Sequence, residues 1–497
     1  MIRRQSIISS IVIYIGFAVG MLNVYFFTRE GLFTPAQYGL TKLFIDIAVM
    51  MAALAGLAMP SYIFKFHPYY QHHLPANKND MVTWALLIGS VGFLLVMLAG
   101  WFFKDLVIRK FGRNSPDLVT YFYWIFPLGF GINLYTILEA YTWSIHRPVL
   151  TNFLKEILWR LLTTVIIVLF LFQMISSFGV FIKLYALTYP AIVAVLVVYL
   201  ISTKQIQFTF RRSKVTRRYI SRMISLCLYA YSGTLVFTLS GIFDSLVIAA
   251  VLDDGLSKAG IFGLAQIMTS VIQAPQRGVV AAAIAHLSKA WKEKNMPMLQ
   301  KIYQRSSINL LLFAAGIFVL IALNYTEAIY TFGLKDAYLA GFSAFVLLGL
   351  TRVVDLGTGL NAQIIGTSNY WRFDLVSGVI LLALMMPLTY LLAKKFDILG
   401  PAAANLISVS IYNVIRIAFL WKKFKLQPFT SSSFYILVIA ICSYAISYFA
   451  FRQVHGFSGI VLRSMLFIVL YGGSVFYFKL SPDVQPVWES LRKRIRL

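Results

Sequence analysis

The chain has 497 residues, of which 59% are hydrophobic and only 12% are charged. Soluble domains carry roughly 25% charged residues, and a charge at the centre of a bilayer costs at least ~2.5 kcal/mol. The composition therefore excludes an ordinary soluble protein and predicts an all-α integral membrane protein. The net charge of +26 does not indicate nucleic-acid binding, because the basic residues are scattered over loops at helix ends.

Fourteen membrane spans are predicted, because a helix needs roughly 20 apolar residues to cross a bilayer. The first apolar run is too long for the core of a signal peptide and has no Ala-x-Ala cleavage site, so it is interpreted as a span. The loops are short, and none can house a soluble catalytic domain. The predicted spans lie near 5–28, 39–65, 81–103, 118–141, 150–172, 179–201, 222–250, 260–286, 304–324, 337–362, 374–394, 402–421, 432–451 and 461–480.

The distribution of Lys and Arg predicts that both chain termini are cytoplasmic. Basic clusters at 202–222, 289–294, 422–425 and 492–496 all share one side with the N-terminal arginines when the chain has fourteen spans. The basic loop 104–113 disagrees, since it falls on the other side. Either that loop contacts anionic head groups, or the number of spans is locally wrong.

The pattern of the first half returns in the second half about 224 residues later. TREGLFTPAQYGL at 28–40 aligns with LDDGLSKAGIFGL at 252–264, which places Gly31 on Gly255. A second pair of segments, 176–190 and 396–410, aligns at a shift near 221. A duplicated helix bundle of this kind usually moves something across a bilayer.

The repeat divides the chain into four predicted parts. An N-lobe of six helices is followed by a basic cytoplasmic connector, a C-lobe of six helices, and two appended helices with a basic cytoplasmic tail. Six spans separate the repeats, so the two lobes are expected to be related by a pseudo-two-fold axis along the membrane normal. The four parts are 1–201, 202–221, 222–425 and 426–497.

Two of these segments resemble the polysaccharide flippase family of the multidrug/oligosaccharidyl-lipid/polysaccharide exporter superfamily. LFTPAQYGL at 32–40 is similar to the turn between that family's first two helices, and ILGPAAANLIS at 398–408 resembles the start of its twelfth helix. The order of the motifs and the number of spans extend the resemblance over nearly the whole chain. The resemblance implies two lobes around a central cavity and transport by alternating access.

The implied substrate is a polyprenyl-diphosphate-linked oligosaccharide, moved from the cytoplasmic to the periplasmic leaflet of a bacterial inner membrane for O-antigen-type (lipopolysaccharide) or other surface polysaccharide biosynthesis. The diphosphate needs a polar, preferably cationic cavity, whereas the tail can stay among membrane lipids. Coupling to a proton or sodium ion, and association of the monomer with a polysaccharide polymerase, remain open. No nucleic acid, cofactor, metal or catalytic residue is expected, and the chain has no G-x-x-x-x-G-K-[ST] run for ATP.

Charged residues inside the spans are the candidate site residues, because they are expensive in a bilayer and normally face a cavity or a partner. Arg277, in QAPQRGVVAAAIAH, is interpreted as a contact for substrate phosphate or sugar; the alternatives are a buried ion pair or a side chain that reaches the interface. The other substrate-binding candidates are Lys42, Arg29, Arg352, Arg160 and Lys155, and the ion-coupling candidates are Asp46, Asp244 and Asp355.

Three candidate pairs have opposite charges at helical spacing. Each pair is either a structural ion pair or a set of groups that meets the substrate or the coupling ion. For all three, a structural pair is the default interpretation. The pairs are Lys42 with Asp46, Glu156 with Arg160, and Arg352 with Asp355.

Four other features of the sequence are not predicted to form a functional site. Glu139, at the end of the fourth span, is expected to be solvated. The histidines of HPYYQHH at 67–73 have no second cluster of ligands nearby, so this segment is predicted to be an exposed cytoplasmic loop. Cys227 and Cys442 are expected to be packing residues, and two cysteines cannot form a disulfide framework.

Two other functions are compatible with a membrane protein of this kind. A cation-coupled multidrug exporter of the same superfamily is disfavoured because the first span has no acidic residue and the helix count is two too many. A membrane-embedded glycosyltransferase or polysaccharide polymerase needs paired acids at the membrane surface and usually a sizeable outer loop. The one acidic pair of that kind, Asp253 and Asp254, lies in a short loop and is interpreted as a turn.

Overall fold

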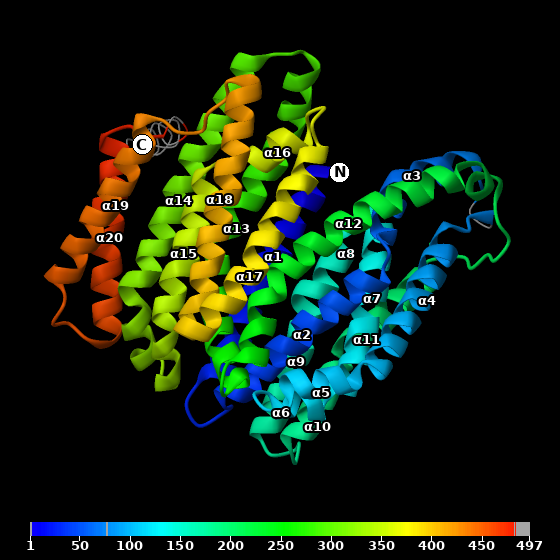
Figure 1. Cartoon of the computed structure of the whole chain (residues 1–497), viewed down its shortest axis with the longest axis horizontal. Helices are drawn as coiled ribbons and strands as arrows, with labels where there is room; N and C mark the ends of the chain where they lie inside the picture. The colour runs from blue at the N-terminus through cyan, green and yellow to red at the C-terminus, as the bar shows by residue number, and fades with distance from the viewer. Residues whose placement is uncertain (1, 76–77, 482, 484–497) are drawn as a thin grey trace. The chain divides into compact units, whose positions relative to one another are not determined.

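The computed structural model describes residues 2–75, 78–481 and 483. The chain forms two compact units, Met1–Gly260 and Ile261–Leu497. It is 84% helix, with no strand in the described residues (Figure 1). The predicted all-α class is therefore confirmed, and the basic cluster at 492–496 lies outside the described residues.

The helices of the first unit run up to the start of α13. They are α1 (Ile2–Thr28), α2 (Pro35–Ala55), α3 (Met59–His73), α4 (Met81–Phe102), α5 (Lys104–Phe111), α6 (Pro116–Thr120), η2 (Phe122–Trp124), α7 (Ile125–Ser144), α8 (Pro148–Asn152), η3 (Phe153–Leu158), α9 (Trp159–Leu171), α10 (Phe178–Ala186), α11 (Thr188–Ser202) and α12 (Lys214–Val251).

The second unit begins inside α13 and continues to the end of the chain. Its helices are α13 (Gly255–Lys292), α14 (Met296–Thr331), η4 (Asp336–Ala340), α15 (Gly341–Gly357), α16 (Asn361–Gly366), α17 (Arg372–Phe396), α18 (Leu399–Phe424), α19 (Ser431–Ala450) and α20 (Gly456–Tyr477). Within this unit α19 and α20 pack against α14 and against each other. They correspond to the two appended helices predicted at 432–451 and 461–480.

Twelve helical segments in the described part of the chain are long and apolar enough to cross a membrane. The two remaining predicted spans, 118–141 and 150–172, are largely helical but fall outside the twelve. The first corresponds to α7, which carries Asn133 and Glu139. The second is divided among α8, η3 and α9 and carries three charged side chains. Polar content lowers the hydropathy of both segments.

The predicted span 39–65 is two helices rather than one. The backbone has left-handed φ angles of 44° at Leu57 and 56° at Ala58, and α3 then starts next to Pro60. A proline disfavours helical conformation in the residue before it and is tolerated in the first turn of a new helix. Because α3 continues to His73, the predicted exposed loop at 67–73 is helical, and His67 is buried. That prediction was wrong.

The basic connector is shorter than predicted. It spans 203–213, because α12 begins at Lys214 instead of near 222 and takes several of the basic residues into its first turns. Asp80, fully buried at the start of α4, fixes this end of α12. Its Oδ2 accepts hydrogen bonds from the backbone N–H of Ser213 at 2.9 Å and from the hydroxyl of Thr216 at 2.8 Å. The carboxylate of the residue before α4 thus lies at the N-terminus of α12, where the partial charge of the helix is positive.

The basic loop 104–113 contains a helix. In α5 the side chains of Leu106 and Ile108 are exposed on the surface together with Arg109 and Lys110. A short helix with exposed apolar and basic side chains is typical of a segment that lies in a membrane interface. This arrangement suits the first of the two interpretations, contact with anionic head groups.

The LFTPAQYGL motif forms the turn between α1 and α2. Thr34 caps α2 by accepting a hydrogen bond from the backbone N–H of Gln37, whose side chain accepts one from the N–H of Thr34. This reciprocal arrangement satisfies two donors that a helix start leaves free. Phe33 is fully buried, with ring centroids 5.0 Å from Phe170 and 5.2 Å from Phe181, so the motif is also the centre of an aromatic cluster.

The two aligned turns at 28–40 and 252–264 differ in detail. The left-handed residue is Gly31 (φ 80°) in the first turn and Asp254 (φ 53°) in the second. The loop before α13 is also shorter than the loop before α2. By contrast, Gly179 and Gly400 each occupy the second position of a helix. The acidic pair Asp253–Asp254 lies in the second turn, as predicted.

Gly39 allows two backbones to touch in the first unit. A Cβ atom at Gly39 would lie 1.8 Å from the carbonyl oxygen of Leu256 and 2.8 Å from the nitrogen of Gly260. A Cβ atom at Gly260 would in turn lie 2.2 Å from the carbonyl oxygen of Pro35. Small residues at such crossings are the usual device for close helix packing in membranes, where lipid competes equally for apolar side chains.

We expect Gly39→Ala to destabilise the protein by about 1–3 kcal/mol, because the added methyl group forces two backbones apart. The measurement is thermal unfolding in detergent micelles. The matched control is Gly241→Ala in α12, where a Cβ atom meets nothing within 4 Å and helix propensity alone favours alanine by up to about 1 kcal/mol. Equal melting temperatures for both variants would contradict the close approach.

Candidate functional site

Lys42 and Asp46 form an ion pair on one face of α2. The Lys42 Nζ atom lies 2.6 Å from Oδ1 and 2.5 Å from Oδ2 of Asp46, which is 6% exposed. The spacing of four residues brings the two side chains together on the helix surface. A substrate phosphate or a coupling ion at this place must therefore compete with an existing partner.

The π-helical turn η3 carries two charged side chains just before α9. Its Lys155 lies 3.6 Å from Glu139 of α7, and its Glu156 lies 2.8 Å from Arg160 of α9. Glu139 was expected to be solvated, but its side chain is only 16% exposed. That expectation was wrong, because Lys155 neutralises the carboxylate where the two helices meet. Turns of the π type frequently mark functional positions in helices.

Two glycines of α1 make room for this turn. A Cβ atom at Gly16 would lie 2.3 Å from the carbonyl oxygen of Glu156, and one at Gly20 would lie 3.2 Å from Nε of Arg160. One turn further along, the amide of Asn23 donates to the carbonyl oxygen of Arg160 at 2.9 Å. The Nη1 atom of Arg160 is buried without a hydrogen-bond partner among the described residues, so its donor capacity is only partly used.

Arg352 and Asp355 do not pair, so the predicted structural pair is wrong. Asp355 Oδ1 instead accepts a hydrogen bond from the amide of Asn413 on α18 at 3.0 Å. Asn413 Oδ1 in turn accepts from Asn361 at 2.8 Å and from Thr358 at 2.9 Å. This buried network gives the carboxylate neutral partners and leaves Arg352 with no hydrogen bond or ion pair in the described part of the chain.

The same network ends in a charged pair that the sequence reasoning missed. Arg416 of α18 is 2% exposed, pairs with Asp374, and donates to Ser377 at 3.1 Å. Its guanidinium also lies over the ring of Tyr412, with 4.0 Å between the guanidinium carbon and the ring centroid. The rule applied to Arg277, a charge inside an apolar run, applies equally to Arg416 in the predicted span 402–421.

A second missed pair connects the last helix to α14. Arg463 of α20 lies 2.8 Å from Glu327, which also accepts a hydrogen bond from the backbone N–H of Gly456 at 2.5 Å. Both pairs join helices of the second unit, and their first role is to compensate charge inside the bundle.

The remaining candidates differ in exposure. Arg277 is exposed and has no hydrogen bond or ion pair with any residue that the structure describes, so the buried-pair alternative does not hold for it. Arg29 is exposed at the end of α1, with its guanidinium carbon 5.6 Å from the ring centroid of Tyr25. Asp244 is 2% exposed within α12 and interacts with another residue.

Among the described residues, no group of three or more His, Cys, Asp and Glu side chains is placed to hold a metal ion. Both cysteines are free; Cys227 is partly buried and Cys442 is exposed, so the expected packing role does not hold for Cys442.

No family model and no curated protein matches this sequence. Among solved structures, the lipid II flippase MurJ in its inward closed conformation is similar at a TM-score of 0.75 and 14% identity, over 95% of this chain and 99% of that chain. An inward-facing multidrug resistance MATE transporter of the MOP superfamily is similar at a TM-score of 0.65 and 12% identity, over 83% and 94%. A MATE structure in complex with MaL6 gives 0.58 and 13%, over 85% and 96%.

The chain has the fold of the MOP-superfamily transporters. With twelve candidate spans and these neighbours, it is a multi-pass membrane protein. The neighbours are transporters and flippases rather than enzymes. The agreement with MurJ extends over a larger share of this chain than the agreement with the two MATE structures.

The burial of His67 predicts that the stability of the first unit depends on pH. It lies in α3 beyond the predicted span 39–65, is 6% exposed, and packs edge-on against Tyr141 with 5.9 Å between ring centroids. Burial lowers the pKa of His67 below its usual 6.5, and the nearby His146 lowers it further. The unfolded chain therefore binds a proton more readily than the folded protein, and folding is favoured where this histidine is neutral.

We expect thermal stability to fall as the pH drops from 6.5 through the lower pKa of folded His67, at no more than ~1.4 kcal/mol per pH unit for one group. Melting temperatures in detergent across pH 5–8 measure this slope. His67→Phe should flatten it, whereas His72→Gln, a change at an exposed position of the same helix, should leave it unchanged. An equal slope in both variants would rule out His67 as the source.

Proposed function

We propose that this protein is a flippase that moves polyprenyl-diphosphate-linked oligosaccharide repeat units from the cytoplasmic to the periplasmic leaflet by alternating access, for surface polysaccharide biosynthesis. In this proposal the protein resides in a bacterial inner membrane with both termini in the cytoplasm and performs no catalysis. The proposed lobes are 1–201 and 222–425, with six helices each.

The observation that carries the proposal is the similarity to MurJ over the whole chain. The match covers 95% of this chain and 99% of the neighbour, which is described as a lipid II flippase. The MATE matches cover 83% and 85% of this chain. A fold of the same extent as a lipid-linked sugar flippase favours a substrate with a long membrane-embedded tail over a small soluble drug.

Unpaired arginines support the substrate class. Arg277 and Arg352 lie on α13 and α15, both among the candidate spans, and neither has a counter-ion among the described residues. A cation without a partner is costly at bilayer depth unless a cavity or a ligand compensates it. A diphosphate supplies two negative groups and many acceptor oxygens for guanidinium donors. Arg29 at the end of α1 is a third candidate contact.

Lys42, Lys155 and Arg160 are assigned a different part in the proposal. Each has an acidic partner, at 2.5 Å, 3.6 Å and 2.8 Å respectively. The substrate must exchange with that partner, so these residues would bind it transiently. Asp46, Asp244 and Asp355 remain the proposed carriers of a coupling proton or sodium ion. Asp46 is the strongest of them, because release from Lys42 would leave a buried carboxylate that needs a cation.

A second candidate is lipid II itself, since MurJ is described by that substrate. Both substrates present a polyprenyl diphosphate with a sugar, and they differ in what the sugar carries. Drug export, after the MATE neighbours, and a membrane-embedded glycosyltransferase or polymerase are the remaining outcomes that an experiment must separate.

Deletion or depletion of the gene, followed by analysis of surface polysaccharide and of polyprenyl-diphosphate-linked sugars in each leaflet, tests the proposal. We expect loss of the polymer with repeat units trapped in the cytoplasmic leaflet. Trapped peptidoglycan precursor would instead assign lipid II as the substrate. Intact polymer with increased drug sensitivity would assign drug export, and units that flip but stay unpolymerised would assign an enzyme.

Arg277→Ala should lower transport of the lipid-linked unit by about 10-fold to 100-fold, because a hydrogen bond to a charged group contributes about 1.5–3 kcal/mol. Arg277→Lys should keep an intermediate activity, since it retains the charge without the planar fork. The readout is transport at equal amounts of protein in the membrane. The control is Lys292→Ala, at an exposed position near the end of the same helix, which should transport normally. If Arg277→Ala lost function only because the protein did not reach the membrane, the substrate contact would be refuted.

A further inference from the structure

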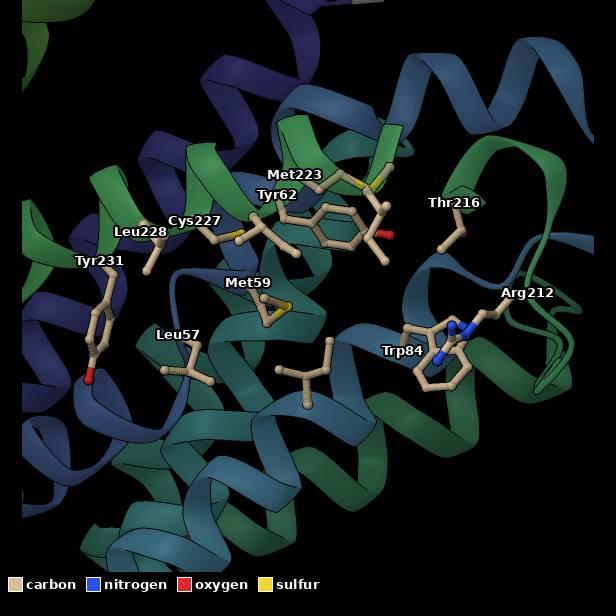
Figure 2. Close-up of a pocket in the computed structure, with 13 residues that line it drawn as sticks. Leu57, Met59, Tyr62, Trp84, Arg212, Thr216, Met223, Cys227, Leu228 and Tyr231 are labelled. Atoms are coloured by element: carbon tan, nitrogen blue, oxygen red, sulfur yellow. The ribbon is translucent and has the colours of Figure 1, made fainter. Parts of the chain in front are cut away.

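An open, mostly apolar cavity lies within the first unit between α3, α4 and α12. It has a volume of about 390 Å³ and is lined by residues of these three helices and of the segments just before α3 and α12. Figure 2 shows Tyr62 and Met223 in its middle, Tyr231 at one end, and Arg212 with Trp84 at the other. None of the candidate substrate-binding or ion-coupling residues lines it.

The wall of this cavity suits a hydrocarbon chain. Met59, Ile88 and Met223 lie along it, and the exposed side chains of Ile224 and Leu228 form one of its edges. Methionine side chains are unbranched and adapt to irregular apolar surfaces. The part of α12 that lines the cavity runs from Thr216 to Tyr231, which corresponds to about 22 Å of helix. Half of a hydrocarbon core is only ~15 Å thick, so the cavity is long enough for an acyl chain.

One end of the cavity is cationic. The guanidinium carbon of Arg212 lies 5.5 Å from the ring centroid of Trp84. Arg212 is exposed and has no hydrogen bond or ion pair within the described residues. The indole Nε1 of Trp84 is buried and has no hydrogen-bond partner there either. Arg211 and Lys214 are exposed as well, but neither lines the cavity.

We propose that this cavity binds an anionic phospholipid, with an acyl chain along α12 and the phosphate at Arg212. A guanidinium offers paired donors to phosphate oxygens, which an ammonium does not. Basic residues at a membrane surface favour anionic over zwitterionic lipid. A tryptophan beside the phosphate is typical of the level at which lipid head groups lie.

The bound lipid would be next to the polar contacts that hold α12. Tyr62 and Thr216 both line the cavity, and their hydroxyls are linked through Tyr70, at 2.8 Å from Tyr62 and 2.7 Å from Thr216. Thr216 also donates to Asp80. The lipid would therefore bind against the start of α12 and stabilise it where it meets α3 and α4.

Native mass spectrometry of the full chain with equal amounts of phosphatidylglycerol and phosphatidylcholine of the same acyl chains tests the proposal. We expect about fivefold preference for phosphatidylglycerol, since one arginine near the surface contributes about that factor. Arg212→Gln should lose the preference. Arg211→Gln removes the same charge one residue away, outside the cavity lining, and should keep it. Equal loss in both variants, or equal binding of both lipids to the unmodified protein, would overturn the proposal.

A measurement on Cys227 does not depend on the folding of an arginine variant. Cys227 lines the cavity, and Cys442 is the chain's only other cysteine. In a Cys442→Ala background, phosphatidylglycerol in nanodiscs should slow maleimide labelling of Cys227 by about fivefold relative to phosphatidylcholine. No protection, or equal protection by inorganic phosphate in phosphatidylcholine nanodiscs, would refute a lipid site. Displacement of the lipid by polyprenyl diphosphate at equal concentration would assign the cavity to the transport path instead and overturn the proposal.

Discussion

The cost of charge inside a bilayer is the constraint on which this structure depends. The chain carries 44 Lys and Arg and 18 Asp and Glu, so most of its cations can have no acidic partner of their own. Five of the described acids within the bundles have a cationic partner, and these partners are Lys42, Lys155, Arg160, Arg416 and Arg463. The arginines that remain unpaired in candidate spans are therefore those with capacity for an anionic ligand.

Local sequence spacing predicted part of this arrangement. Pairs at i and i+4 on one helix, such as Lys42 with Asp46, follow from helix geometry alone. The prediction that Arg352 and Asp355 pair at i and i+3 was wrong, because Asn413, from a helix distant in sequence, supplies Asp355 with a neutral donor at 3.0 Å. The prediction that Glu139 is solvated was wrong for the same reason, since Lys155 reaches it from another helix. Partners across helices depend on packing that a single sequence does not reveal.

The ends of helices are predicted well where hydropathy changes sharply along the sequence. They are predicted less well where only a change of backbone conformation ends a helix. The appended helices α19 and α20 match their predicted positions. The break at Leu57 and Ala58 lies inside an apolar run, so hydropathy gives no signal there, and the indications in the sequence are Gly56 and Pro60. α12 starts earlier than predicted, because the prediction assigns its first basic residues to a loop. Charged side chains are solvated on a helix that extends beyond the membrane, so they do not mark its start.

Asp80 has a mechanical consequence. Its carboxylate accepts from the first residues of α12 while it begins α4. To separate these two helix ends, the protein must expose to water a carboxylate that is now fully buried. The first turns of α12 are therefore fixed to α4. Any flexing of this 38-residue helix must occur further along, towards Gly241, where no neighbouring atom lies within 4 Å of the space a side chain would fill. The start of this helix is therefore fixed, and the rest of it can move only relative to that fixed end.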